Sequence, residues 1–234
     1  MWVKYLKTIL KLENVSKTYM MGEVPVPALK GINFEVNSED FTVILGTSGS
    51  GKTTLLNIIA LLDRPTEGTV FVDELDASEL DDKELANLRL KKFGFMFQTF
   101  QLVPWLTALK NVEVPLTIAG VAREEREERA KDLLNLVGLT DRMNHRPLQM
   151  SGGEQQRVAV ARSLVNNPEV IVADEPTGNL DSKTGTEIIS LLHKLNDEKK
   201  VTIVIVTHDA AIASKAKRTV YLKDGLVVKE EVRA

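Results

Sequence analysis

The chain has 234 residues, of which 43% are apolar and 27% are charged, a mixture typical of a globular protein with a full core. The net charge of -3 gives no basic field that would attract nucleic acid, and the absence of cysteine excludes disulfides and thiolate metal sites. No apolar stretch approaches the roughly 18 residues that span a bilayer, so we expect a cytoplasmic protein whose membrane role, if any, comes through a partner.

The first twelve residues are apolar but are interrupted by three lysines, so they contain no continuous signal-peptide core. Two interpretations remain open. Trp2, Tyr5, Leu6 and Ile9 have helical spacing and could form a small membrane-touching face. The simpler interpretation, which we favour, is a lead-in to the first strand.

Short runs of β-branched and apolar residues predict strands along the whole chain. These runs are residues 10–15, 32–36, 41–45, 69–72, 93–97, 170–173, 201–206, 219–222 and 226–229. Two of them, V-I-V-A and T-I-V-I-V, are apolar at consecutive positions, which is typical of strands buried on both faces of a parallel sheet. Helical periodicity over residues 53–62, 183–196 and 210–215 places helices between the strands, which indicates an α/β fold.

The middle of the chain has a different pattern. Residues 106–165 show no convincing strand and instead predict helices over 108–119, 123–137 and 154–165. The charged run at 123–131 is interpreted as a solvated helix face. We therefore expect one domain over residues 1–234, with an α/β core of about 1–100 and 166–234 and a helical subdomain of about 101–165.

A phosphate-binding motif follows the strand predicted at 41–45. Residues 46–53 read G-T-S-G-S-G-K-T and match the pattern G-x-x-x-x-G-K-[ST]. Backbone N–H groups in such a loop surround phosphate oxygens, and the helix N-terminus favours their negative charge. Lys52 is expected to neutralise the β- and γ-phosphates, and the Thr53 hydroxyl to bind Mg²⁺. The residues expected to contact the nucleotide here are Gly46, Ser48, Gly49, Ser50, Gly51, Lys52, Thr53 and Thr54.

An acidic pair, Asp174 and Glu175, ends the strand predicted at 170–173. Ligands bind at the carboxyl ends of strands in open parallel sheets. Asp174 would hold Mg²⁺, directly or through water, and Glu175 would polarise the attacking water. Taken alone, such a strand end could equally begin a surface loop. The phosphate-binding motif favours the catalytic interpretation.

The sequence from Ser151 to Glu154, S-G-G-E, has two compatible interpretations. Ser151 and Glu154 form the pattern of a capping box at a helix start. Capping does not require the two glycines, Gly152 and Gly153, which weaken a first turn but allow close approach to an anion. One bound ATP needs only one phosphate loop, so a second phosphate site suggests a second chain.

The phosphate loop, S-G-G-E-Q-Q-R and V-A-D-E-P-T-G, in that order, resemble the nucleotide-binding domain of ABC transporters. The resemblance covers the chain from Tyr19 almost to its end. It implies a P-loop NTPase fold with a mixed, largely parallel sheet, an antiparallel β subdomain and an inserted helical subdomain. It also implies an ATPase that binds ATP and Mg²⁺ as a homodimer. In that dimer Ser151, Gly152 and Gly153 of one subunit face the γ-phosphate bound by Lys52 of the other.

The same resemblance implies roles for four more residues. Tyr19 would stack on adenine, and Gln98 would contact Mg²⁺ or water and couple the site to a partner. Asp181 matches the loop after the acidic strand, and His208 matches the switch histidine. Each alone has an ordinary alternative; residues 207–209, for example, could simply begin the helix predicted at 210.

Residues 97–112 and 177–181 resemble the lipoprotein-release and macrolide-export branch of the family, to which a division-associated ATPase is closely related. This implies an integral-membrane permease subunit as partner and a location on the inner face of the cell membrane. The apolar stretch 100–106, which contains Trp105, is either the docking groove for that subunit or core packing.

The sequence disfavours two other functions. A soluble ABC ATPase in translation or repair is disfavoured because the chain has one cassette, no cysteine, no heptad run and no basic tail. A catalytically inactive module is disfavoured because Lys52, Asp174, Glu175 and His208 are all present.

Overall fold

The computed structural model describes residues 7–233. Within them the strands form two sheets. The antiparallel sheet has the order β2-β1-β4-β5. Its strands are β1 (Thr8–Met21), β2 (Val24–Asn37), β4 (Glu67–Val72) and β5 (Leu75–Asp76).

The larger sheet has the order β10-β9-β3-β8-β7-β6. Its strands are β3 (Phe41–Leu45), β6 (Phe93–Met96), β7 (Val170–Asp174), β8 (Thr202–Thr207), β9 (Arg218–Lys223) and β10 (Leu226–Val232). The pairs among β6, β7, β8, β3 and β9 are parallel, and β10 is antiparallel to β9. Their carboxyl ends therefore meet along one edge, which is where the phosphate loop and the acidic pair lie.

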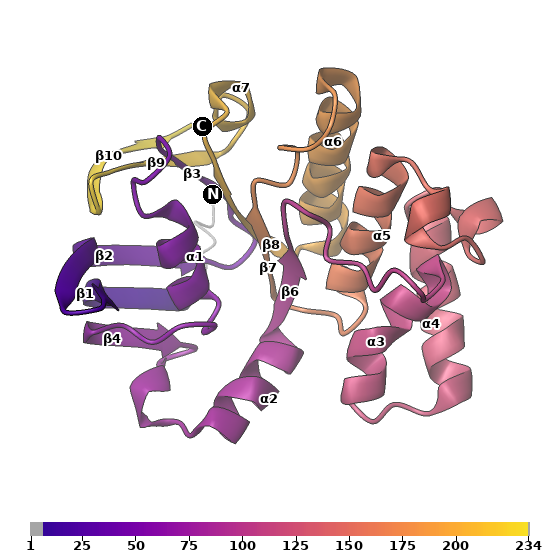
Figure 1. The fold of residues 1–234 in the computed structure, drawn as a ribbon, viewed down its shortest axis with the longest axis horizontal. Helices are drawn as coiled ribbons and strands as arrows, with labels where there is room; N and C mark the ends of the chain where they lie inside the picture. The colour runs from indigo at the N-terminus through magenta and orange to yellow at the C-terminus, as the bar shows by residue number, and fades with distance from the viewer. Residues whose placement is uncertain (1–6, 234) are drawn as a thin grey trace, which may run out of the picture.

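The helices are α1 (Lys52–Ile59), α2 (Asp82–Lys92), α3 (Ala108–Ile118), α4 (Arg123–Leu136), α5 (Gly152–Leu164), α6 (Ser182–Lys199) and the single turn α7 (Ala210–Ala213). Short 3₁₀ turns occur at Ala77–Glu79, Thr140–Arg142 and Pro147–Gln149. In Figure 1, α3, α4 and α5 gather at one side of the molecule and the antiparallel sheet lies at the other.

The central strands β7 and β8 are buried on both faces, as their consecutive apolar residues predicted. Val170 and Val172 of β7 pack in a core with α1 and the antiparallel sheet. Ile171 and Ala173, on the opposite face of the same strand, pack in a second core with α3, α4, α5 and α6. Because successive side chains of a strand point to opposite faces, one strand contributes to two cores.

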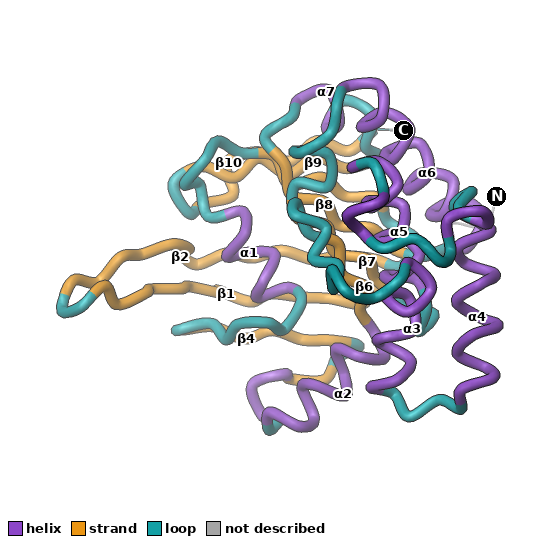
Figure 2. The backbone as a smooth tube through the Cα atoms, turned by 45° about the vertical axis from the view of Figure 1, so that its right-hand side comes forward, coloured by secondary structure: helices purple, strands orange, loops and turns teal. Residues whose placement is uncertain are grey.

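Helix α1 lies between the two sheets and contacts strands of both. On the other side α3 packs against α4 and α5, and residues 97–169, all described, contain no strand. Figure 2 shows the β1–β2 hairpin extending away from the larger sheet. These are the expected elements of the fold: the mixed, largely parallel sheet, the antiparallel sheet and the group of helices between β6 and β7.

Two elements were not predicted. Helix α2 begins at a capping box in which the Asp81 side chain accepts from Glu84 N and the Glu84 side chain accepts from Asp81 N. That D-x-x-E pattern is legible in the sequence, but α2 buries little beyond Leu85 and so lacks an apolar period. The two-residue strand β5 is too short for any alternation. Helix α1 ends at Ile59, earlier than predicted, and Leu61 adopts φ 57°.

Of the four residues that could form a membrane-touching helical face, the structure describes Ile9. Thr8–Leu12 belong to strand β1, and Ile9 is buried in it, so Ile9 is not part of a helical face. Trp2, Tyr5 and Leu6 lie outside the described residues. Within residues 7–233, no helix has both the length and the apolar character required to cross a bilayer.

Candidate active site

The phosphate loop connects β3 to α1, as the motif requires. Gly51 is the N-cap of α1 with φ 100°. A Cβ at this position would lie 2.6 Å from the Ala28 carbonyl oxygen of β2, so a side chain is excluded by both space and backbone conformation. The close approach of β2 thus fixes one side of the loop.

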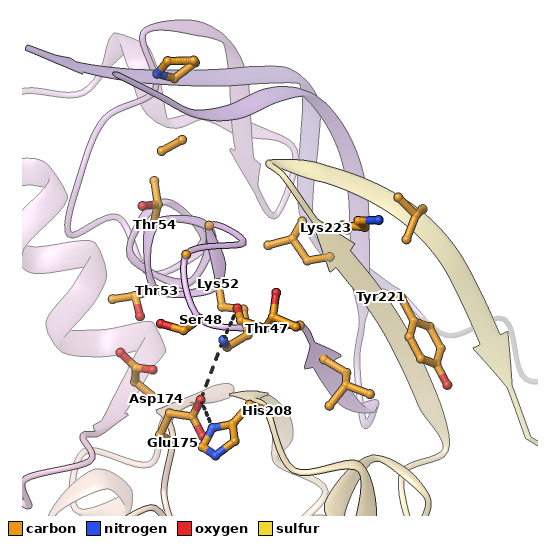
Figure 3. Close-up of a pocket in the computed structure, with 18 of the residues that line it drawn as sticks. Thr47, Ser48, Lys52, Thr53, Thr54, Asp174, Glu175, His208, Tyr221 and Lys223 are labelled. Atoms are coloured by element: carbon orange, nitrogen blue, oxygen red, sulfur yellow. Dashed lines mark hydrogen bonds and ion pairs between the residues drawn. The ribbon is translucent and has the colours of Figure 1, made fainter. Parts of the chain in front are cut away.

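Lys52 is buried at the start of α1. Its Nζ donates to the Thr47 carbonyl at 3.0 Å and lies 3.8 Å from Glu175 Oε1. Figure 3 shows the Lys52 ammonium pointing from the phosphate loop toward the Glu175 carboxylate. The phosphate loop therefore faces the acidic pair at the carboxyl end of β7, and the Lys52 ammonium lies between the loop and Glu175.

The two acidic residues have different surroundings. Asp174 is the last residue of β7; burial and then the Glu175 charge raise its pKa, against a hydrogen bond from Thr53 and the charge of Lys52. Glu175 adopts φ 45°. Its Oε2 accepts from Thr207 Oγ1 at 2.9 Å, and its Oε1 lies 2.9 Å from His208 Nδ1.

These groups line one cleft of about 1180 Å³. The predicted site residues that line it are Tyr19, Gly46, Ser48, Gly49, Gly51, Lys52, Thr53, Thr54, Gln98, Asp174, Glu175 and His208. They come from β1, the phosphate loop, α1, the last residue of β7 and the segments after β6, β7 and β8. Parts of the chain separated by up to about two hundred positions thus meet at one edge of the larger sheet.

Ser50 is the one residue predicted in the phosphate loop whose side chain lies apart from the cleft lining. It is not among the residues that line the cleft, and its side chain is buried, with an Oγ that has no hydrogen-bond partner among the described residues. Its carbonyl accepts from Gly225 N at 3.0 Å. In this structure Ser50 therefore contacts the β9–β10 turn.

The S-G-G-E segment lies outside the cleft lining. Ser151 is exposed and is the N-cap of α5; its Oγ accepts from Glu154 N at 3.2 Å, and its N donates to Glu154 Oε2 at 2.8 Å. The predicted capping box is confirmed. A Cβ on Gly153 would lie 2.5 Å from the Thr184 Cγ2 atom of α6. Packing within the chain thus supplies a reason for glycine at 153 that the sequence did not reveal.

Asp181 also lies outside the cleft lining. Its side chain caps α6, accepting from Lys183 N, Thr184 N and Thr184 Oγ1 at 3.1, 3.0 and 2.6 Å. At the start of α7 the cap is Asp209, whose Oδ1 accepts from Ala211 N at 2.7 Å. The cap of α7 is therefore Asp209, and the His208 ring contacts Glu175 instead of the helix start.

Several cleft residues were missed by sequence reasoning. They are Val26, Pro27, Ala28, Leu45, Thr47, Tyr221, Leu222, Lys223 and Val228. Most come from β2 or from the β9–β10 hairpin, strands that contact each other in the fold. No motif marks the residues of β2 and of the hairpin, because they enter the cleft through this long-range contact.

The donors at the site fit Mg²⁺. Among the described residues no group of three or more His, Asp or Glu side chains could enclose a metal by itself. Thr53, Asp174 and Gln98 line the same cleft and supply hydroxyl, carboxylate and amide oxygens. Mg²⁺ typically binds to one or two protein oxygens and completes its shell with substrate phosphates and water.

A sequence model described as "ABC transporter" matches residues 29–178, more than half of the chain. The chain belongs to the ABC transporter family. It is 53% identical over 227 residues to the uncharacterized ABC transporter ATP-binding protein MJ0796 of Methanocaldococcus jannaschii. The aligned residues cover 95% of this chain and 97% of that protein. It is therefore an ATPase cassette of the ABC type.

Solved structures agree with the fold. The dimeric structure of the MJ0796 cassette matches with a TM-score of 0.89 at 52% identity, covering 97% of this chain and 100% of that one. A dimeric post-hydrolysis state of MJ0796, bound to ADP and Pi, matches with the same TM-score at 51% identity and 97% coverage of this chain. The macrolide export ATP-binding/permease protein MacB of Syntrophobacter fumaroxidans is 47% identical over 224 residues, which cover 95% of this ABC chain but only 31% of that protein.

Proposed function

We propose that the chain binds Mg²⁺–ATP in the cleft and hydrolyses it, and that two copies sandwich the nucleotides to drive an integral-membrane partner. The observation that carries this proposal is the contact chain from Lys52 through Glu175 to His208, at 3.8 and 2.9 Å, beside the phosphate loop. It unites a phosphate-binding cation, a carboxylate base and a histidine that holds the base in place.

Each residue then has one role. Lys52 binds the β- and γ-phosphates, while Thr53, Asp174 and Gln98 hold Mg²⁺, which neutralises charge on those phosphates when bound. Glu175 takes the proton of the attacking water. Lys52 Nζ lies 3.8 Å from Glu175 Oε1 at the end of the phosphate loop, so the same cation would stand beside both the phosphates and the base.

The phosphate loop and Tyr19 would supply the other contacts to the nucleotide. Gly46, Ser48, Gly49, Gly51 and Thr54 are proposed to surround the phosphates, with Tyr19 against the base. Ser50 would act through its backbone, because its side chain is buried away from the cleft.

We propose a homodimer in which Ser151, Gly152 and Gly153 complete the partner's site, with Asp181 beside them at the interface. Ser151 and Asp181 are exposed, and none of these residues lines the cleft of their own chain, so a second chain is the way to bring them to a phosphate. The cap uses the Glu154 N–H, so the N–H groups of Gly152 and Gly153 at the start of α5 would be the ones that meet an anion. The dimeric MJ0796 structures support this arrangement.

The proposed membrane partner is an integral-membrane permease subunit, and the cassette would lie on the cytoplasmic face. Trp105 is 72% exposed and Leu148 is 92% exposed, and both line a second hollow with Pro104. Buried Asn111 fixes the loop that carries Trp105, since its side chain accepts from Val103 N and donates to the carbonyls of Val103, Leu106 and Thr107. A rigid exposed tryptophan is typical of an interaction hot spot. The helical subdomain of about 101–165, with the core of about 1–100 and 166–234, would present it.

The central test is ATP binding and phosphate release by the Lys52→Ala variant. Removing a charged phosphate contact should weaken ATP by about tenfold to a hundredfold, and phosphate release at low ATP should fall with it. The matched control is Lys83→Ala on exposed α2, which should behave as wild type. Equal ATP affinity of Lys52→Ala and wild type would overturn the site.

A further inference from the structure

Tyr19 is held in the wall of the cleft by a polar network. Its hydroxyl donates to Asp63 Oδ2 at 2.9 Å, and Lys17 Nζ donates to Asp63 Oδ1 at 2.6 Å. Lys17 Nζ also lies 4.9 Å from the centre of the Tyr19 ring, within cation–π range. The ring is therefore fixed through its hydroxyl and by a cation at the same time.

Both charged residues of this network are themselves anchored. Lys17 Nζ donates to the Arg64 carbonyl at 2.7 Å, and Arg64 N donates to Asp63 Oδ1 at 2.8 Å. The Lys17 side chain is 13% exposed. Partial burial alone would raise the pKa of Asp63, but hydrogen bonds from Lys17, Tyr19 and Arg64 N lower it, so the carboxylate is charged at neutral pH.

The loop that carries Asp63 is fastened to β1 beyond these contacts. Thr66 N donates to the Ser16 carbonyl at 2.8 Å, and Thr18 N donates to Thr66 Oγ1 at 3.0 Å. Asp63 follows α1, whose first residue is Lys52. The network thus links the position of Tyr19 to the same helix whose N-terminus forms the phosphate loop.

We propose that Asp63 and Lys17 are positioning residues that hold Tyr19 as a platform for the nucleotide base, at a set distance from the phosphate loop. This inference rests on the proposed function, in which Tyr19 stacks on adenine. Asp63 and Lys17 are not among the described residues that line the cleft, whereas Tyr19 is, so they act on the nucleotide through Tyr19. The Tyr19 hydroxyl is engaged within the chain, which leaves the ring to meet the base.

The test compares two probes on the full chain, ATP and inorganic tripolyphosphate, which has no base. Asp63→Ala should weaken ATP about tenfold, the size of one lost base–aromatic contact, and should leave tripolyphosphate affinity unchanged. Lys17→Met, which keeps an unbranched side chain of similar length, should show the same selective loss. Arg64→Ala is the matched control: it keeps both backbone contacts of the network and should bind both probes as wild type.

A double-variant cycle identifies the route of the effect. In a Tyr19→Leu background, Asp63→Ala should weaken ATP no further, because the group it positions is gone. An additive loss would overturn the inference, as would an Asp63→Ala protein that binds ATP normally or loses both probes equally. Wild-type protein that binds neither probe would overturn the proposed function, and this inference with it. Wild-type protein that binds both, with Asp63→Ala unchanged, overturns this inference alone.

Discussion

Glu175 and His208 lie 2.9 Å apart, Oε1 to Nδ1, although they follow different strands of the larger sheet. The other carboxylate oxygen of Glu175 accepts from Thr207 Oγ1. Thr207, which ends β8, and His208, which follows it, therefore fix the orientation of the Glu175 carboxylate after β7. Since β7 and β8 are parallel and hydrogen-bonded along their length, this contact follows directly from the fold.

The first prediction concerns this pair. Glu175→Gln should lower kcat for ATP hydrolysis by about a hundredfold or more, because the amide cannot accept a proton. His208→Ala should also lower kcat, since it frees the carboxylate to rotate. If the two act as one unit, the double variant should be no slower than Glu175→Gln. Steady-state phosphate release measures all three, and independent, multiplicative losses would contradict a shared role.

The second prediction concerns assembly. Glu175→Gln should retain ATP without cleaving it, so a stable dimer should accumulate in size-exclusion chromatography with saturating ATP. Adding Ser151→Arg should block that dimer while ATP still binds the monomer, because the new side chain would occupy the end of α5 that faces the partner. Ser78→Arg, at an exposed serine beside the antiparallel sheet, is the control that should still dimerise. A Glu175→Gln protein that stays monomeric counts against the sandwich.

The sequence predicted most of the fold because its strongest signals are local. The consecutive apolar residues of β7 and β8 required a sheet buried on both faces, and the glycine pattern required a strand–loop–helix unit. Helix α2 was missed because it has almost no buried face, so only its Asp81–Glu84 capping box marked it.

The residues of the site were predictable where they belong to a sequence motif. The contacts around Tyr19 were not, because Lys17 and Asp63 are 46 positions apart and meet only after the loop following α1 packs on β1. Trp105 was ambiguous for a related reason. A bulky aromatic in an apolar run is compatible with a core or a surface, and only the fold shows it to be exposed.

The third prediction concerns stability in acid. Asp73 is paired with Lys7 at 2.6 Å and with Lys92, and although burial alone would raise its pKa, these two partners lower it. A lowered folded-state pKa stabilises the protein above the unfolded-state value of about 3.9, and this contribution disappears as the pH falls through the folded-state pKa. Asp73→Asn should therefore lower the free energy of unfolding at pH 7 by at most about 1 kcal/mol, because the site is partly exposed.

The measurement is urea unfolding of Asp73→Asn and wild type between pH 2 and pH 7. The difference between the two should be largest near neutral pH and should vanish at the acid end. A difference that stays constant across this range would mean that the asparagine acts through packing and that the charge of Asp73 contributes nothing.

The fourth prediction concerns the membrane partner. Trp105→Glu should leave the isolated chain folded with basal ATPase near wild type, because the side chain is 72% exposed and does not line the nucleotide cleft. It should nevertheless prevent assembly with the proposed membrane partner, since the new carboxylate would be buried without a counter-charge in that interface. Ile118→Glu is the matched control: Ile118 is 70% exposed at the end of α3 and is not among the residues of the Trp105 hollow.

Thermal melting, ATPase rate and co-purification of an integral-membrane protein in detergent decide between the outcomes. Unfolding of Trp105→Glu would show that Trp105 stabilises the fold, and normal co-purification would place the docking surface elsewhere on the chain.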